Sequence, residues 1–335
     1  MKKKALIFGV DGQDGSLIAD FLIKKKYKII GTYRDKKIKK LKNLNIHNKI
    51  KLINCDITNF PKVNNLINQN SPDEIYNFAG VSTLKKSENN LKENDQTNNQ
   101  AVLNIMLSIK DNKKKIKFFL SLSSELFKKD KKINFCNEET KLEFNNAYSI
   151  SKISSYNYLK LLRKKYKLKL YAGFLFNHAS YYSRNDFLIK KVVEDFHRLK
   201  NNKIKEIMVG NLNAKRDWIY SKDLVEIIWK ITQLNKPSDF VIGSGKLFTV
   251  KEVVNEVAKN YGFVLKWKTR RNELLGFDLK SKKIIVKTTQ IYKRNENNLA
   301  VANIKKLRKF VKNLKITNFK KMIKLICDDQ KKFGI

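Results

Sequence analysis

The chain has 335 residues, of which 42% are apolar and 31% charged, a globular composition that excludes disorder and low complexity. No apolar run approaches the roughly 20 residues of a transmembrane helix, so no membrane association is expected, and three cysteines without a CxxC pair argue against a zinc site or disulfides and for a reducing cytoplasm. The net charge of +41 suits a nucleic-acid binder. However, 63 of the 72 basic residues are Lys and run from end to end, which indicates a solvated basic surface and no specific nucleic-acid partner.

The first half of the chain alternates short apolar runs with amphipathic segments. The spacing predicts strands over 5–8, 28–32, 50–54, 74–78, 117–122 and 168–175, and helices over 16–25, 60–69, 90–111 and 148–166. Such alternation is typical of a parallel sheet covered on both faces, in the order of a doubly wound α/β fold of the Rossmann type. After residue 176 we expect loops and isolated helices at 187–200, 250–260 and 317–332, forming a smaller domain.

Three glycines follow the first strand and open a helix. Gly9, Gly12 and Gly15 would permit a tight turn and the close approach of a dinucleotide pyrophosphate to the helix N-terminus. The intervening Gln13 and Asp14 belong to the same predicted cofactor contact. An ordinary glycine-rich β–α turn is the alternative interpretation.

The residue after the second strand bears on the choice of cofactor. Arg34 stands where an acidic residue would bind the ribose of NAD, and an arginine suits the 2′-phosphate of NADP. Asp35 would repel that phosphate, so NADP is favoured while NAD stays open. Asp56 follows the third strand, next to Ile57, and could accept from the adenine amino group. A turn or helix-capping role for Asp56 is the alternative.

A candidate catalytic set follows the fifth strand. Ser123 lies at the strand end, and Tyr148 and Lys152 come later, four residues apart on one helix face. The Tyr-x-x-x-Lys spacing carries no weight by itself, because Tyr33 and Tyr156 match it too in so lysine-rich a chain. Only Tyr148 has the serine-rich strand end upstream.

The chemistry of this set is that of a hydroxyl oxidation. A nearby lysine ammonium and oxidised nicotinamide would lower the pKa of Tyr148, which could then take a proton from a sugar hydroxyl while Ser123 holds the oxygen. Glu125 adds a carboxylate that could remove a proton alpha to the new ketone and protonate a leaving hydroxyl. A solvated loop acid is the alternative for Glu125.

These motifs resemble the extended short-chain dehydrogenase/reductase superfamily and, within it, the GDP-mannose 4,6-dehydratase family, over nearly the whole chain. The matching stretches are residues 9–16 (GVDGQDGS), 72–82 (PDEIYNFAGVS), 123–127 (SSELF), 147–152 (AYSISK), 175–178 (LFNH), 210–218 (GNLNAKRDW) and 239–245 (DFVIGSG). The resemblance implies oxidation of GDP-mannose at C4, loss of water across C5–C6 and hydride return to C6. Tyr148 would be the C4 base, Lys152 its partner, Ser123 the donor to the C4 oxygen and Glu125 the C5/C6 acid–base.

The resemblance also implies the binding residues. Cofactor contacts beyond the glycine loop, Arg34, Asp56 and Ile57 would be Phe78, Ala79, Ser82, Tyr148, Lys152, His178 and Arg184. Substrate contacts would be Ser82, Ser123, Asn177, Lys191, Arg216, Arg294 and Glu296. Arginine against a diphosphate is reasonable chemistry in any case, whereas Lys191 could equally be a surface lysine.

The chain departs from the family pattern at three places. After LFNH the family has Glu-Ser-Pro-Arg-Arg and this chain has residues 179–184 (ASYYSR), so the cofactor arginine is missing or displaced to Arg184. The family's Arg-Arg is here Arg34-Asp35. The segment after it is shortened to 36–49, which favours a homodimer over the family's tetramer. Changes around the hexose pocket could mean another GDP-sugar, such as a heptose or an amino sugar.

We therefore expect an NADP-dependent GDP-mannose 4,6-dehydratase, a carbon–oxygen lyase, in the cytoplasm. Residues 1–175, with 212–243 returning to them, would form the NADP-binding domain, and 176–211 and 244–335 the nucleotide-sugar-binding domain. A dehydratase of another GDP-sugar, or a GDP-sugar 4-reductase or epimerase in which Glu125 is incidental, is the alternative. A non-enzymatic dinucleotide- or nucleic-acid-binding protein would lack a use for the catalytic set.

Overall fold

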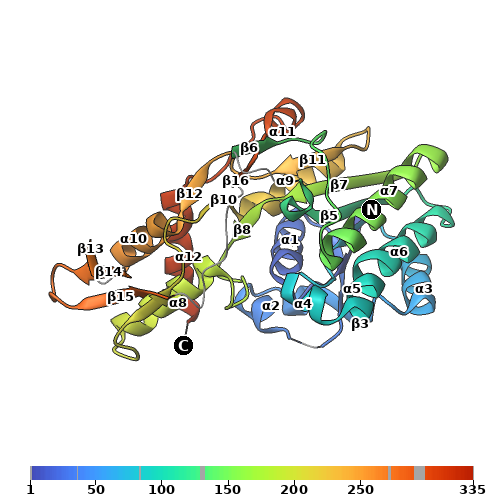
Figure 1. Ribbon diagram of the computed structural model, residues 1–335. Helices are drawn as coiled ribbons and strands as arrows, with labels where there is room; N and C mark the ends of the chain where they lie inside the picture. Colours follow the sequence, from blue (N-terminus) through green and yellow to red (C-terminus); the bar gives the residue numbers. More distant parts are fainter. Residues whose placement is uncertain are drawn as a thin grey trace.

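The protein folds as a large sheet with helices on both faces, extended at one end by a smaller group of helices and strands (Figure 1). The structure is a computed structural model that describes residues 2–35, 37–82, 84–128, 133–270, 273–289 and 299–334. The predicted doubly wound α/β fold is confirmed.

Seven parallel strands form the large sheet, in the order β11-β7-β5-β4-β1-β2-β3. They are β1 (Lys4–Phe8), β2 (Lys28–Tyr33), β3 (Ile50–Asn54), β4 (Glu74–Asn77), β5 (Lys117–Ser123), β7 (Lys169–Leu175) and β11 (Asp239–Ile242). The chain leaves β1 toward β2 on one side and returns to β4 on the other. The connections therefore diverge at the carboxyl ends of β1 and β4, and ligands of doubly wound folds bind in the crevice at such a switch point.

Helices cover both faces because the central strands are buried on both sides. On one face α1 (Gln13–Lys24) packs against α9 (Ser221–Gln233), and on the other α3 (Phe60–Asn70) and α7 (Ala147–Tyr166) flank α6 (Ala101–Lys110). Short helices follow β2 and β4, namely α2 (Lys39–Asn43), η1 (His47–Lys49), α4 (Leu84–Asn89) and α5 (Leu91–Asp95). One hydrophobic core fills the space between these helices and the sheet.

The single helix predicted over 90–111 is instead broken by a π-helical turn. α5 passes into five π-helical residues, Gln96–Gln100, before α6 begins. This run, QTNNQ, contains weak helix formers and competing side-chain amides. π-Turns inside helices are often found at functional sites, and this one lies beside the candidate site.

The second half of the chain builds a separate hydrophobic core. Its helices are α8 (Leu188–Lys200), α10 (Val250–Asn260) and α12 (Phe319–Phe333), and its small sheets are β13-β14-β15-β9 and β12-β10-β8, whereas helix α11 (Lys305–Phe310) and the strand pair β16-β6 pack against the core of the large sheet. The strands are β6 (Ile133–Cys136), β8 (Asn177–Ala179), β9 (Ile207–Val209), β10 (Lys215–Tyr220), β12 (Leu247–Thr249), β13 (Leu265–Arg270), β14 (Glu273–Asp278), β15 (Ile284–Thr288) and β16 (Leu299–Ala302). The three predicted helices are confirmed, but the expectation of loops between them missed the four-stranded sheet.

A buried aspartate ties a small sheet to the edge strand β11 of the large sheet. Asp217, on β10, accepts hydrogen bonds from the backbone N–H groups of Ser244, Gly245 and Ala302 at 2.7, 2.9 and 3.0 Å. The hydroxyl of Ser244 donates to the same carboxylate at 2.7 Å. Four donors to one carboxylate tie β10 to the loop after β11 and to β16, which fixes Arg216 next to this junction.

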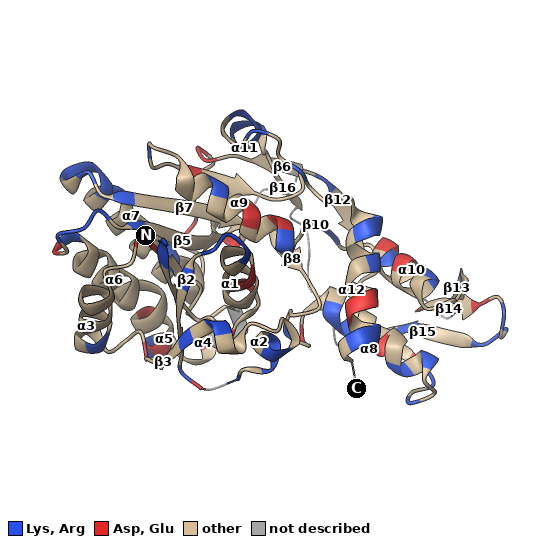
Figure 2. Cartoon of the chain, turned by 180° about the vertical axis from the view of Figure 1, so that it is seen from behind, with Lys and Arg blue, Asp and Glu red and all other residues tan. Residues whose placement is uncertain are grey.

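Basic residues are spread over the helices of both halves, with acidic residues among them (Figure 2). Among the described residues, no helix combines the length and apolar character needed to cross a membrane.

Candidate active site

In the turn between β1 and α1, backbone atoms of neighbouring segments lie unusually close together. Gly9 has φ +76°, and a Cβ on it would lie 2.9 Å from the Ala79 nitrogen, while a Cβ on Gly15 would lie 2.1 Å from the Gly9 oxygen. Gly12 is the N-cap of α1, and no side chain caps this helix. The amides of the first turn of α1 therefore face outward at the positive end of the helix dipole, where a pyrophosphate binds. This cradle fits a dinucleotide cofactor.

A second segment, residues 176–184, closes the cradle from the other side. The side chains of Ser180 and Ser183 both donate to Gln13 Oε1, the first at 2.8 Å. Arg184 donates to the Ser82 hydroxyl at 3.2 Å and also pairs with Asp186. The sequence that departs from the family pattern thus still contacts the glycine loop and the loop after β4.

Three of the four predicted catalytic residues, Ser123, Tyr148 and Lys152, line one cavity of about 130 Å³ beside the glycine loop, and Glu125 follows Ser123 by two residues outside its lining. The lining of this cavity comprises Asp14, Phe78, Ala79, Gly80, Val81, Ser82, Ser121, Leu122, Ser123, Tyr148, Lys152 and Leu175. Tyr148 lies near enough to Ser123 for the serine to lower the pKa of the phenol. Lys152 Nζ donates to the Ser121 carbonyl at 3.1 Å, and the backbone N–H of Glu125 donates to Ser123 Oγ at 3.2 Å. Strand β5, the short helix η3 (Ser124–Leu126) and helix α7 position all four residues.

Burial sets the proton affinities of the central pair. It raises the pKa of Tyr148 to about 12, further raised by the charge of Glu125 and opposed by the nearby Ser123 side chain. Burial also lowers the pKa of Lys152 to about 8. The lowering of the Tyr148 pKa that we expected from Lys152 is outweighed here, because both groups are desolvated and the ammonium is held by the Ser121 carbonyl.

His178 and Asp14 form a charged pair under the glycine loop. His178 Nδ1 lies 2.9 Å from the Phe176 carbonyl, which can only accept, so Nδ1 carries a hydrogen. Nε2 lies 3.1 Å from Asp14 Oδ2. Burial opposes both charges, but each charge favours the other, so the pKa of His178 is raised and that of Asp14 lowered. Both shifts favour the charged forms of the pair, which holds the 176–184 segment against α1.

We expect this pair to stabilise the fold most between the ordinary pKa values of its two groups. Because the pKa of His178 is raised above 6.5 on folding, the contribution of His178 is complete below that value and is lost as the pH rises through its folded-state pKa, whereas the contribution of Asp14, whose pKa is lowered from 3.8, is lost in acid. Urea unfolding of wild type and His178→Gln should therefore differ by about 1.5–3 kcal/mol in the window between these two values and by less in alkali. A difference independent of pH would contradict the charged pair. His197→Gln is the control, because burial lowers the pKa of His197 and its protonation disfavours folding.

Two asparagines that sequence reasoning missed connect the walls of the cavity. Asn98, in the π-turn, donates to the Val81 carbonyl at 3.0 Å and to Asn94 Oδ1 at 2.8 Å. Asn94 in turn donates to the Ala147 carbonyl at 2.8 Å, directly before Tyr148. The sequence feature that could have indicated these two asparagines is the polar run inside an otherwise helical pattern. The two side chains hold the loop after β4 against the first turn of α7.

The residues predicted to read the adenosine half lie at the ends of β2 and β3. Arg34 forms an ion pair with Glu93 at 2.9 Å. Asp56 accepts from the backbone N–H and hydroxyl of Thr58 at 2.9 and 2.8 Å, which is the turn role we weighed for it, and Ile57 is buried. An adenine contact by Asp56 stays a prediction.

Of the predicted substrate residues, Ser82 and Ser123 line the catalytic cavity, whereas Asn177, Lys191 and Arg216 do not. Asn177 is exposed on β8, and Lys191 pairs with Asp195 at 2.7 Å and donates to the Met208 carbonyl at 3.0 Å. Arg216 donates to the Lys215 carbonyl at 2.7 Å. Arg294 and Glu296 lie outside the described residues. A diphosphate contact by these side chains stays a prediction.

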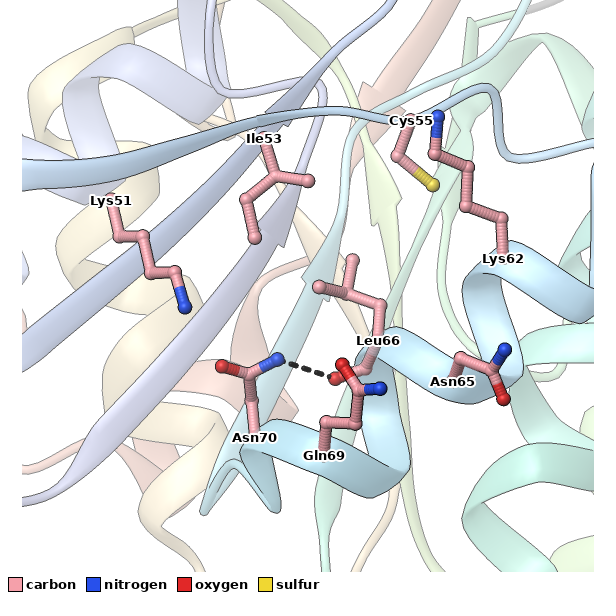
Figure 3. A pocket seen from close by; sticks show the side chains of 8 residues that line it. All are labelled: Lys51, Ile53, Cys55, Lys62, Asn65, Leu66, Gln69 and Asn70. Carbon is pink, nitrogen blue, oxygen red and sulfur yellow. Dashed lines mark hydrogen bonds between the residues drawn. The ribbon is translucent and has the colours of Figure 1, made fainter.

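A larger cavity of about 220 Å³ lies elsewhere, between the outer strand β3 and helix α3 (Figure 3). Its lining is Lys51, Ile53, Cys55, Lys62, Asn65, Leu66, Gln69 and Asn70. Asn70 donates to the Leu66 carbonyl at 2.8 Å, which is an ordinary contact within the helix. The lining of this larger cavity holds no paired acid and base. We therefore take the smaller cavity beside the glycine loop as the candidate active site.

Comparison with known proteins gives consistent matches. A family model described as GDP-mannose 4,6 dehydratase matches residues 6–326. A GDP-mannose 4,6 dehydratase of Dictyostelium discoideum is 29% identical over 338 residues, covering 96% of this chain and 94% of that protein. The protein of the same name from Homo sapiens is 30% identical over 283 residues, covering 81% and 76%.

Solved structures share the fold at lower identity. A dTDP-glucose 4,6-dehydratase from Bacillus anthracis in complex with NAD has a TM-score of 0.79 at 19% identity, covering 98% of this chain and 97% of that one. RMD from Pseudomonas aeruginosa complexed with NADPH has a TM-score of 0.77 at 14% identity, covering 99% of both. These likenesses concern the fold, and both of those proteins hold a nicotinamide dinucleotide.

Proposed function

Because the chain belongs to the GDP-mannose 4,6-dehydratase family, we propose that it is a nucleotide-sugar 4,6-dehydratase that converts GDP-mannose to GDP-4-keto-6-deoxymannose. The observation that carries the proposal is the meeting of Ser123, Tyr148 and Lys152 at one cavity beside a phosphate-binding turn, with Glu125 next to Ser123. A reductase or epimerase has no use for that carboxylate.

The residues divide the work between oxidation and elimination. Tyr148 takes the proton of the C4 hydroxyl, and Ser123 donates a hydrogen bond to the C4 oxygen. Lys152 lies one helical turn below Tyr148 and holds the phenol side of the cavity positive when protonated. Glu125 then removes the proton at C5 and protonates the hydroxyl that leaves C6, so that one water is lost. A bound nicotinamide would supply the redox chemistry, taking hydride from C4 and giving it to C6. C5 then takes up one proton, which balances the proton that Tyr148 removed from the C4 hydroxyl, so no external reductant is consumed.

The cofactor in this proposal is NADP, held by the residues around the first β–α turn. The first-turn amides of α1 receive the pyrophosphate, and Arg34 receives the 2′-phosphate through a charge-assisted hydrogen bond. The buried Asp14–His178 pair keeps the turn in place. Three free, buried cysteines support a reducing, cytoplasmic setting, and a homodimer is the proposed assembly.

Mass spectrometry of a reaction with GDP-mannose tests the proposal directly. The product should be lighter than the substrate by one water without any added reductant, and denatured protein should release NADP(H). An isomer of unchanged mass would point to an epimerase. If another GDP-sugar lost water and GDP-mannose did not, the proposed reaction would stand and the proposed substrate would be wrong. Release of NAD(H) alone would overturn the role given to Arg34.

Two arginine variants test the substrate's diphosphate site. Arg216→Lys and Arg294→Lys should each raise KM for the GDP-sugar far more than they lower kcat, because the diphosphate is bound alike in the ground and transition states. Loss of paired bonds to a charged group corresponds to about 1.5–3 kcal/mol per arginine. Arg198→Lys, at an exposed helix end, is the control. An unchanged KM in both variants would place the GDP site elsewhere.

A further inference from the structure

The arginine proposed for the cofactor's 2′-phosphate already has an anionic partner. Arg34 Nη1 lies 2.9 Å from Glu93 Oε1, across 59 residues of sequence. Glu93 comes from α5, whereas Arg34 directly follows β2. The pair therefore bridges the turn after the second strand and the helix after the fourth, on the adenosine side of the predicted cofactor path.

Glu93 is held in place by its own helix. Asn90 caps α5 by accepting from the Glu93 backbone N–H at 3.1 Å, and its side-chain amide donates to Glu93 Oε2 at 3.2 Å. One carboxylate oxygen thus faces Asn90 and the other faces Arg34. This fixed geometry distinguishes Glu93 from a freely moving surface acid, although its side chain is 40% exposed and that of Arg34 60%.

Other carboxylates surround the same guanidinium. The hydrogen bond with Glu93 and the charges of Glu93, Asp35 and Asp56 together raise the pKa of Arg34. The backbone carbonyl of Arg34 accepts from Asn54 Nδ2 at 2.8 Å, which anchors this residue to the end of β3. A doubly charged phosphate that approached Arg34 would have to displace Glu93 and would then face three carboxylates. A ribose hydroxyl could instead donate to one of them.

We propose that Glu93 is a specificity-determining residue which, by occupying Arg34, lowers the preference of this chain for a dinucleotide with a 2′-phosphate over one with a 2′-hydroxyl. The inference rests on the proposed function, because it takes the turn after β1 to be a nicotinamide-cofactor site. Glu93 affects the affinity of the protein for the adenosine end of the cofactor and does not act on the reacting atoms.

Calorimetric titration of the full-length protein, freed of bound nucleotide, with NADP⁺ and with NAD⁺ tests this inference. Glu93→Gln should lower the Kd for NADP⁺ by about two- to fivefold, the range that exposed ion pairs contribute, and should leave the Kd for NAD⁺ unchanged. Asp95→Asn is the matched control. It removes the same charge from the same helix, where Asp95 accepts from Asn99 and not from Arg34.

A double-mutant cycle separates the ion pair from the general field of the carboxylate. In an Arg34→Gln background, Glu93→Gln should no longer change the Kd for NADP⁺. An equal gain with and without Arg34, or with Asp95→Asn, would overturn the inference, as would an unchanged ratio of the two Kd values in Glu93→Gln. Failure of the wild type to bind either dinucleotide would instead overturn the proposed function.

Discussion

Replacing Tyr148 by phenylalanine is expected to lower kcat by about 10²- to 10⁴-fold, the range for loss of a general base. The ring of Tyr148 is buried against the cavity wall, and phenylalanine keeps that packing. What is lost is the phenolic oxygen that would accept the C4 proton. KM should change little, because the substrate's diphosphate is held elsewhere in the proposed site.

Tyr156→Phe is the matched control for this variant. It stands two helical turns further along α7 and also fits the Tyr-x-x-x-Lys spacing, but its hydroxyl donates to Asp239 at 2.7 Å, beside the Arg163 ion pair. It should therefore lose stability and keep its turnover. Steady-state kinetics with GDP-mannose measures both variants. Equal losses of kcat in the two would remove Tyr148 from its proposed place as the base.

The first half of the fold could be predicted because its signals are local. Strands such as β1 and β5 are apolar runs bounded by turns, and helices such as α1 and α7 repeat apolar residues at helical spacing. Gly9 and Gly15 predicted a tight turn, which the structure contains, and the approach of a pyrophosphate to it stays a prediction. That Ser123, Tyr148 and Lys152 lie together could also be predicted, because α7 packs near β5 in a fold of this class, while their catalytic roles stay a prediction.

The second half was harder because its strands are short and exposed. β13 reads LKWKTR, with charged residues at alternate positions and little burial, so its period-2 pattern does not stand out in a chain so rich in lysine. β9 has three residues and pairs with β15 far along the sequence. Such strands are defined by their partners and not by their own composition.

Contacts between residues that are distant in sequence could not be predicted from the sequence patterns. Asp14 and His178 were each predicted to contact the cofactor, but nothing in either motif indicates that they bind one another across 164 residues. Likewise, Arg34 could be assigned to a phosphate from its position after β2, while its contact with Glu93 depends on how α5 is placed by the π-turn. Charge matching in a chain with 72 basic and 31 acidic residues selects no unique partner.

Replacing Glu125 by glutamine should stop the reaction at a different step from Tyr148→Phe. The charge of Glu125 raises the pKa of Tyr148, so its removal lowers that pKa and C4 oxidation should still proceed. Glutamine cannot take the C5 proton or protonate the leaving C6 hydroxyl. The reduced dinucleotide should therefore accumulate on the enzyme after one turnover, while release of dehydrated product ceases.

Single-turnover absorbance of the reduced nicotinamide, followed by mass spectrometry of the sugar, distinguishes the two blocks. Glu125→Gln should give a stoichiometric absorbance rise with no loss of water, Tyr148→Phe should give neither, and Glu139→Gln, an exposed acid after β6, should behave as wild type. Normal turnover in Glu125→Gln would show that another group performs the elimination. It would also remove the geometric argument for a dehydratase over an epimerase. An absorbance rise in that variant alone would separate oxidation from elimination within one cavity.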